Sequence, residues 1–465
     1  MNMINVRRLT VMTFLGAGML SGISAQVSPL QVDTLKETKI PDQWDLQSCI
    51  DYAKEQNITI RKNRITAVST QIDVKTAKAA LFPSLSFSTG HQVVNRPYQE
   101  TSSRVSGSEI ISSNSKTSYN GNYGLNASWT LYNGNKRLKT IQQEKLNNQM
   151  AELDVATSEN NIQESIAQVY IQILYAAESV KVNENTLQVS IAQRDRGQEL
   201  LNAGSIAKSD LAQLEAQVST DRYQLVTAQA TLEDYKLQLK QLLELDGENE
   251  MNIYLPALSD ENVLAPLPTK KDVYIRALSL RPEIEASKLN VEASELGIGI
   301  AKSSYLPTIS LSAGIGTNHT SGSDFTFGEQ VKNGWNNSIG LSVSVPIFNN
   351  RQTKSAVQKA KLQYETSMLS LLDEQKTLYK TIEGLWLDAN SAQQRYAAAN
   401  EKLKSTQISY ELISEQFNLG MKNTVELLTE KNNLLQAQQE QLQAKYMAIL
   451  NTQLLKFYQG DQLAL

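Results

Sequence analysis

Two stretches of this chain are near copies of each other, although more than two hundred residues separate them. The first is LFPSLSFSTG at 81–90, and the second is YLPTISLSAG at 305–314. Each contains a proline, then alternating polar and apolar residues, then a glycine. A chain that repeats such a pattern is built from two copies of one large unit, and units of this size exclude a short solenoid period.

The flanking segments repeat in the same order. WTLYNGNKR at 129–137 matches VPIFNNRQT at 345–353. LNAGSIAKSDLAQLEA at 201–216 matches FNLGMKNTVELLTEKN at 417–432. We therefore predict a signal peptide at 1–25 and two repeats joined by a linker. The predicted repeats are 26–246 and 269–465, with the linker at 247–268.

Four segments have the period-two alternation of strands with one apolar and one polar face. They lie at about 84–95, 118–132, 308–318 and 335–347. The Ser/Gly/Asn-rich stretches at 100–118 and 318–334 are predicted to be loops joining each pair.

The remaining sequence is predicted to be helical, at 45–81, 135–201, 206–245, 270–303, 351–417 and 424–459. The helix at 135–201 would extend roughly 100 Å. The predicted helices at 45–81 and 206–245, placed end to end, would match this length. Apolar residues also recur at heptad spacing, which predicts helices packed along their length. They are Leu211, Leu214, Val218, Leu225, Leu232, Tyr235, Leu239 and Leu242, and later Leu428, Leu435, Leu442 and Ile449.

Proline and asparagine mark the predicted helix–strand junctions. Pro83 and Pro307 would end the incoming helices, since proline lacks an amide hydrogen. Pro346 lies at a strand end. Asn133 and Asn349 would form the turns and caps that start the long helices. Aromatic residues gather at these junctions, either as a membrane-interface girdle or as ordinary core residues: Phe82, Tyr132, Tyr305 and Phe348.

The N-terminus has the basic, apolar and small-residue regions of a secretory signal peptide, with cleavage predicted after Ala25. The alternative is an uncleaved membrane anchor.

The net charge is −4, and no basic patch indicates nucleic-acid binding. Cys49 is the only cysteine, so no intrachain disulfide is possible, and we predict that it packs in a helix interface.

Four strands cannot close a barrel, and lipid does not tolerate open sheet edges. Two copies would give about eight strands and a filled lumen, and three would give about twelve and an open pore. At this point the chain resembles the TolC-type outer-membrane efflux proteins, the outer membrane factors. The resemblance rests on the duplicated Leu/Phe-Pro-Ser/Thr-x-Ser strand start, the Pro-Ile-Phe-Asn strand exit and the paired Asn-x-Gly turns. Thr130 departs from it, standing where the second half has Pro346.

The resemblance implies a mainly α fold with a membrane β-barrel contribution. Each chain would supply four transmembrane strands and long antiparallel helical hairpins that form a periplasmic α-barrel. A homotrimer would complete the barrel in the bacterial outer membrane. Its partners would be a periplasmic adaptor protein and an inner-membrane transporter.

Candidate site residues come from the same resemblance. Glu426, with Thr429 three residues later, would form the pore constriction. Gate links would involve Ser209, Asp210, Lys422 and Phe417, the last standing where the family has a tyrosine. The alternative is that these residues only cap a solvated helix tip. The adaptor would dock at the glycine turns, on Leu201, Ala203, Gly204, Leu419, Gly420 and Met421.

No catalytic constellation is visible. The two histidines, His91 and His319, have no metal-ligand spacing, and we predict no enzyme activity, no cofactor and no metal. The leading hypothesis is a passive exit duct of a tripartite efflux pump, gated at its helical tip. The alternatives are a duct for type I protein secretion and a periplasmic coiled-coil scaffold without a pore.

Overall fold

A computed structural model describes residues 41–98, 102–106, 109–113, 116–246, 251–256, 263–321 and 325–463. The predicted signal peptide at 1–25 and part of the predicted linker at 247–268 lie outside these residues. The described residues belong to one compact unit that begins at Pro41. Within the described ranges, no helix is long and apolar enough to cross a membrane.

The two halves of this unit contain helices of equal length in the same order. The first half has α2 (Leu46–Gln56), α3 (Ile58–Ala79), α4 (Lys136–Asn202) and α5 (Lys208–Leu242), and the second has α6 (Lys270–Leu280), α7 (Pro282–Ser303), α9 (Gln352–Asn418) and α10 (Thr424–Tyr458). The paired lengths are 11, 22, 67 and 35 residues. The sequence duplication is therefore a duplication of structure.

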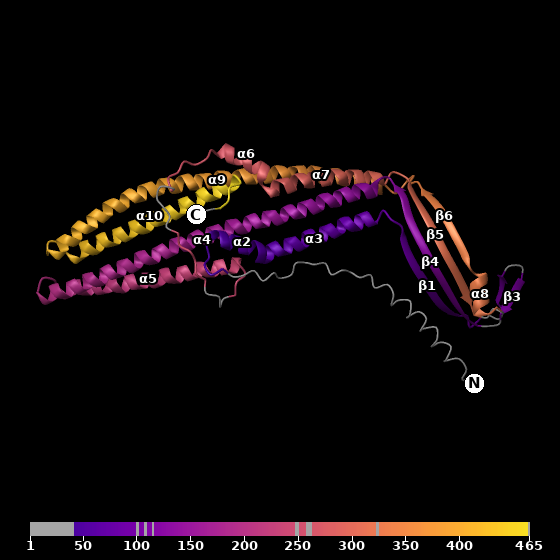
Figure 1. Cartoon of the computed structure of the whole chain (residues 1–465), viewed down its shortest axis with the longest axis horizontal. Coiled ribbons are helices and arrows are strands. Elements are labelled where there is room, and N and C mark those ends of the chain that lie inside the picture. The colour runs from indigo at the N-terminus through magenta and orange to yellow at the C-terminus, as the bar shows by residue number, and fades with distance from the viewer. Residues whose placement is uncertain are drawn as a thin grey trace, which may run out of the picture. The chain divides into compact units, whose positions relative to one another are not determined.

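The helices pack along their length as two hairpins, α4 with α5 and α9 with α10 (Figure 1). Helix α3 packs on α4, α7 packs on both α9 and α4, and α10 also contacts α4. The end of α5 meets the start of α3, where the Asn57 side-chain amide donates to the Leu242 carbonyl at 3.0 Å. The two shorter helices thus lie end to end beside α4, as the lengths predicted.

Two predicted helices are interrupted. The segment predicted at 45–81 breaks at Asn57, whose side-chain oxygen caps α3 by accepting from the amides of Thr59 and Ile60. The segment predicted at 270–303 breaks at Arg281, because Pro282 begins α7 and cannot continue α6. Both breaks lie at the joint where one short helix follows another.

One four-stranded antiparallel sheet has the order β1-β4-β5-β6. Its strands are β1 (Ser84–Asn95), β4 (Thr117–Asn133), β5 (Thr308–Thr320) and β6 (Asn336–Ser344). The last strand ends before Pro346, earlier than predicted. The stretches predicted as loops also contain regular elements, namely β2 (Ser102–Ser106) paired with β3 (Glu109–Ser113), and the short helix α8 (Phe327–Asn333).

The strand register places apolar residues on one face of this sheet. Trp129 lies opposite Leu311, and Leu311 lies opposite Leu341. Directly opposite residues share a face, so the alternation read from the sequence becomes an apolar sheet surface. Much of that surface is exposed in the single chain, with Phe87 at 67% and Ile339 at 79%.

The turns that start the long helices use left-handed backbone, and the Asn133 side-chain oxygen accepts from the Arg137 amide in the first turn of α4 at 3.4 Å. Gly134 and Asn135 have φ of 67° and 64°, and Asn350 and Arg351 have φ of 51° and 67°. The N-cap residues are Asn135 and Arg351, neither with a side-chain cap hydrogen bond. Asn133 and Asn349 therefore precede the caps, two residues earlier than an N-cap role requires.

We predict that Gly134→Ala lowers the unfolding free energy by about 1–3 kcal/mol, because a Cβ is strained at this φ. The added Cβ would also lie 2.8 Å from the Ser303 carbonyl oxygen. Gly384→Ala, in the interior of α9 with nothing within 4 Å of its Cβ, should leave stability unchanged or raise it. Thermal unfolding followed by circular dichroism compares the two. Equal melting temperatures would contradict the strained-turn interpretation.

Candidate functional site: the hairpin tips and a buried polar cluster

Each helical hairpin turns at a glycine with left-handed backbone. Gly204 has φ of 75° and Gly420 has φ of 74°, and a Cβ at either would meet nothing within 4 Å. The amide one residue after each glycine donates back to the helix, Ser205 to Leu200 at 2.8 Å and Met421 to Gln416 at 2.8 Å. This pattern ends a helix in a tight reversal, so the two tips have the same backbone geometry.

The predicted docking residues at these tips are mostly exposed. Leu419 is 73% exposed and Met421 is 63% exposed, while Leu201 is half-buried. Ala203 and both glycines are exposed as well. The tip of the second hairpin therefore presents an apolar surface to solvent in the single chain.

The predicted constriction residue Glu426 makes contacts within its own helix end. Its carboxylate accepts from the Lys422 ammonium at 2.7 Å and from the Asn423 amide at 3.3 Å. Its amide donates in return to the Asn423 side chain at 2.9 Å, which completes a capping box. The Lys422 contact, with the Asn423 amide, lowers the pKa of Glu426. The carboxylate is thus ionised at neutral pH, and the contact is lost only as pH falls below the usual glutamate range.

The other predicted gate residues do not meet one another within the chain. Asp210 accepts from the amide of Ala207 at 3.0 Å, at the start of its own helix. Ser209 is exposed, and the Thr429 hydroxyl donates to the Val425 carbonyl at 2.8 Å. Phe417 is buried, so it packs rather than presenting a face to solvent. Links between copies of the chain remain a prediction.

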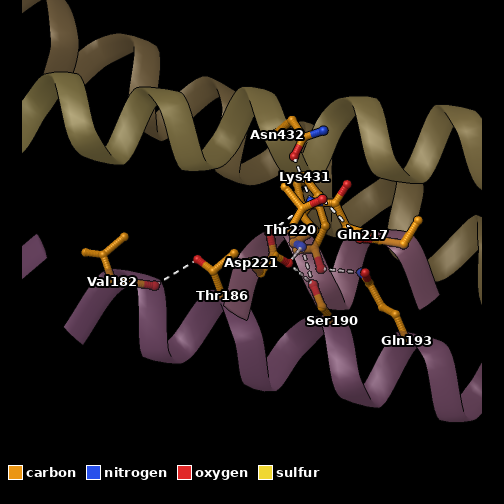
Figure 2. A network of polar contacts seen from close by, with 11 residues as sticks. Val182, Thr186, Ser190, Gln193, Gln217, Thr220, Asp221, Lys431 and Asn432 are labelled. Carbon is orange, nitrogen blue, oxygen red and sulfur yellow. Dashed lines mark hydrogen bonds and ion pairs between the residues drawn. The ribbon is translucent and has the colours of Figure 1, made fainter. Parts of the chain in front are cut away.

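A buried polar cluster, which the sequence analysis did not identify, joins the two hairpins. It consists of Ser190 on α4, Asp221 on α5 and Lys431 on α10 (Figure 2). All three side chains are buried, with exposed fractions of 3% or less. The Lys431 ammonium forms an ion pair with the Asp221 carboxylate and donates to the Ser190 hydroxyl, which itself donates to the same carboxylate.

Further polar contacts surround this cluster. The Gln217 amide donates to the other Asp221 oxygen at 2.8 Å and to the Asn432 side chain at 3.4 Å. Nearby, the Gln193 amide donates to the Tyr410 hydroxyl at 2.8 Å. Burial lowers the pKa of Lys431, and Asp221 opposes that shift through its hydrogen bond and its charge. The ammonium is held in a dry interface because its counter-ion lies beside it.

The sequence carried a signal for this cluster. Asp221 follows Val218 by three residues and precedes Leu225 by four, so it occupies a seam position of the predicted heptad pattern. On α10 the seam is displaced from the prediction. Leu427, Lys431 and Leu434 are buried, whereas Leu428 and Leu435 are only half-buried. Each of the two seams thus contains one charged residue among its apolar positions.

The hairpin tips have no arrangement typical of an ion-ligating or catalytic centre. Across the described ranges, no group of three or more histidine, cysteine, aspartate or glutamate side chains could hold a metal ion. The free thiol of Cys49 is buried, in agreement with its predicted packing role. The tips offer instead an apolar exposed turn and a capped carboxylate, and the polar cross-link between the hairpins lies several helical turns away.

Comparison with known proteins identifies the family. The family model described as outer membrane efflux protein matches residues 49–244 and 273–460. The chain therefore belongs to the outer membrane efflux protein family, and its two matched segments follow the two structural repeats.

Curated relatives are similar to this chain in sequence, and a solved structure is similar to it in fold. The chain is 24% identical over 294 residues to the outer membrane efflux protein BepC of Brucella suis biovar 1 (strain 1330), covering 63% of this chain and 61% of the relative. It is 24% identical over 294 residues to the outer membrane protein TolC of Escherichia coli (strain K12), covering 61% of this chain and 58% of the relative. A crystal structure of CusC superposes with a TM-score of 0.76 at 19% identity, covering 90% of this chain and 92% of that chain.

We predict that Lys431→Met destabilises the protein by about 3–5 kcal/mol, because it leaves the Asp221 carboxylate buried without a counter-ion. The double variant Lys431→Met/Asp221→Leu should recover most of that loss. The matched control is Lys402→Met, which breaks the exposed Lys402–Glu440 pair at 2.7 Å between α9 and α10 and should cost at most about 1 kcal/mol.

Thermal unfolding of the purified variants compares these changes. A Lys431→Met melting temperature equal to that of Lys402→Met would contradict a buried ion pair between the hairpins.

Proposed function

We propose that this chain is the outer-membrane exit duct of a tripartite efflux pump that exports small molecules. The observation that carries the proposal is the sheet. Strands β1 and β6 each pair on one side only within the four-stranded order β1-β4-β5-β6. Both edge strands also carry exposed apolar residues on one face, including Leu85 at 69% and Leu341 at 65%. In a single copy, the outer edges of β1 and β6 lack strand partners, and the apolar face stays exposed.

Three copies arranged in a ring satisfy the edges. The β6 strand of one copy pairs with β1 of the next, which closes about twelve strands into a barrel with an open lumen. The apolar face then meets lipid, and the Ser/Asn/Gly face lines the water-filled interior. The junction aromatics Phe82 and Phe348, exposed at 73% and 83%, lie at the membrane interface.

The helical hairpins of three copies form the periplasmic tunnel. Each hairpin carries large apolar residues that are more than 45% exposed in the single chain, and neighbouring copies cover them. They include Tyr223, Val226, Leu237, Leu362, Leu369, Leu372, Ile408 and Leu412. A periplasmic coiled-coil scaffold without partners would leave these apolar residues exposed to water, which is unfavourable. Their exposure therefore argues against the scaffold alternative.

The tips form the gate and the docking surface. Glu426 and Thr429 line the constriction, and Asp210, Ser209 and Lys422 supply polar links between neighbouring copies. Gly204 and Gly420, with the exposed Leu419 and Met421, meet the periplasmic adaptor. The duct itself is passive, and the inner-membrane transporter supplies the energy.

Planar-bilayer recordings of the purified oligomer test this proposal. The wild type should form a small, cation-selective conductance. Glu426→Gln should lower the cation selectivity, because it removes the constriction charge. Lys422→Met should raise it, because it frees the Glu426 carboxylate from its 2.7 Å ion pair.

Opposite shifts in the two variants identify this pair as part of the pore. Unchanged selectivity in both would place the constriction elsewhere in the tunnel. Recovery of the protein in the soluble periplasmic fraction, or no conductance from folded and inserted protein, would contradict the duct.

A further inference from the structure

The two histidines of the 465-residue chain lie in different halves of the duplicated sequence, and the sheet brings them together. His91 on β1 lies opposite Gly121 on β4, and Gly121 lies opposite His319 on β5. The three residues form one row across three adjacent strands, so both imidazoles stand on the same face of the sheet on either side of a glycine.

Two tyrosines complete a ring of side chains around that glycine. Tyr119 and Tyr123 flank Gly121 on β4 and share its face. The centroid of His91 lies 5.7 Å from that of Tyr119 and 5.4 Å from that of Tyr123. His319 lies 5.2 Å from Tyr119 and 6.2 Å from Tyr123. Each imidazole therefore contacts both phenol rings.

The absence of a side chain at Gly121 lets the two imidazole Nδ1 atoms approach the same space. A Cβ built on Gly121 would lie 2.6 Å from Nδ1 of His319 and 3.2 Å from Nδ1 of His91. Nδ1 of His319 is buried and has no hydrogen-bond partner. Phe327 of α8, at the end of the sheet away from the helical hairpins (Figure 1), packs edge-on against the His319 ring at 5.0 Å. Buried polar atoms in proteins are nearly always paired, so an unpaired nitrogen in this position calls for a partner.

We propose that His91 and His319 bind a divalent transition-metal ion through their Nδ1 atoms, above Gly121. Imidazole nitrogen is the donor that Cu²⁺, Ni²⁺ and Zn²⁺ prefer, and Cu²⁺ binds most tightly in that series. Small rotations of the rings bring both nitrogens to the roughly 2.1 Å of a metal–imidazole bond. The Tyr119 hydroxyl and water complete the coordination.

Contacts already present prepare His91 for this role. Thr89 Oγ1 lies 3.1 Å from Nε2 of His91, and the Tyr119 hydroxyl lies 2.7 Å from its Nδ1. When Nε2–H donates to Thr89, Nδ1 accepts from the Tyr119 hydroxyl, and a bound ion would replace that hydroxyl hydrogen at the Nδ1 lone pair. The Tyr119 oxygen would then be the third donor to the ion, after the Nδ1 atoms of His91 and His319. Both histidines share the sheet face of Leu85 and Trp129, so in the proposed duct the site stands on the outer face, toward the strand ends farthest from the helical hairpins.

Titration of the purified protein, without a polyhistidine tag, with Cu²⁺ tests the proposal. We expect one ion per chain, with an electron paramagnetic resonance spectrum showing hyperfine coupling to imidazole nitrogen. Because the chain has no other histidine, this wild-type spectrum alone identifies the ligands.

Variants then locate the site. His91→Gln or His319→Gln should weaken Cu²⁺ binding at least tenfold, and the double variant should lose the nitrogen coupling. Tyr119→Phe keeps the ring but removes the hydroxyl, and should weaken binding by a factor of about 10–100. The matched control is Tyr132→Phe, at the opposite end of the same strand, which should leave the affinity unchanged. Circular dichroism of each variant verifies the fold.

Three results would overturn the proposal. The first is the absence of saturable Cu²⁺ binding to folded wild-type protein. The second is a bound ion without imidazole coupling. The third is an affinity that survives both histidine substitutions in folded protein, which would place the ion on oxygen ligands elsewhere.

Discussion

Unpaired strand edges are the constraint on which the rest of this structure depends. Every backbone amide and carbonyl in lipid needs a partner within the protein, and the described sheet leaves one side of β1 and one side of β6 without one. In the proposed duct, β6 of one copy pairs with β1 of the next and supplies the missing hydrogen bonds. It also fixes the arrangement of the helices, because α4 follows β4 directly and α9 follows β6 after a short connection. Closure of the sheet, as proposed, would place the hairpins of all copies side by side around one axis.

Most of the correct fold predictions came from the internal sequence duplication. Repeated proline, strand and asparagine patterns located the four long strands and the long helices, and equal lengths in the two halves follow from that repeat. The sequence analysis missed the helix breaks at Asn57 and Arg281. The second break could have been predicted from Pro282, which begins α7. The first break is evident only from the contact between Asn57 and the end of α5.

Contacts between distant segments could not be predicted. Asp221 and Lys431 are 210 residues apart, and although Asp221 falls on the predicted apolar seam, nothing in the sequence pairs it with Lys431. Only packing of α5 against α10 shows that they are buried together with Ser190. The proximity of His91 and His319 could not be predicted for the same reason. The two residues lie on β1 and β5, and only the strand order shows that β4 alone separates them. The short hairpin β2–β3 and helix α8 were hidden for another reason, because Ser, Gly and Asn enrichment is typical of loops.

Cysteine cross-linking between the two edge strands tests ring closure most directly. In a Cys49→Ala background, Ser86→Cys on β1 is combined with a single cysteine at Ser338, Ser342 or Ser344 on β6. Ser86 and Ser338 lie in one row with β4 and β5 between them. They are thus about 14 Å apart within a chain, too far for a disulfide. The account predicts that mild oxidation of intact membranes yields covalent dimers and trimers, and nothing larger, for at least one pair. Monomers alone at every position, or a ladder beyond three copies, would contradict it.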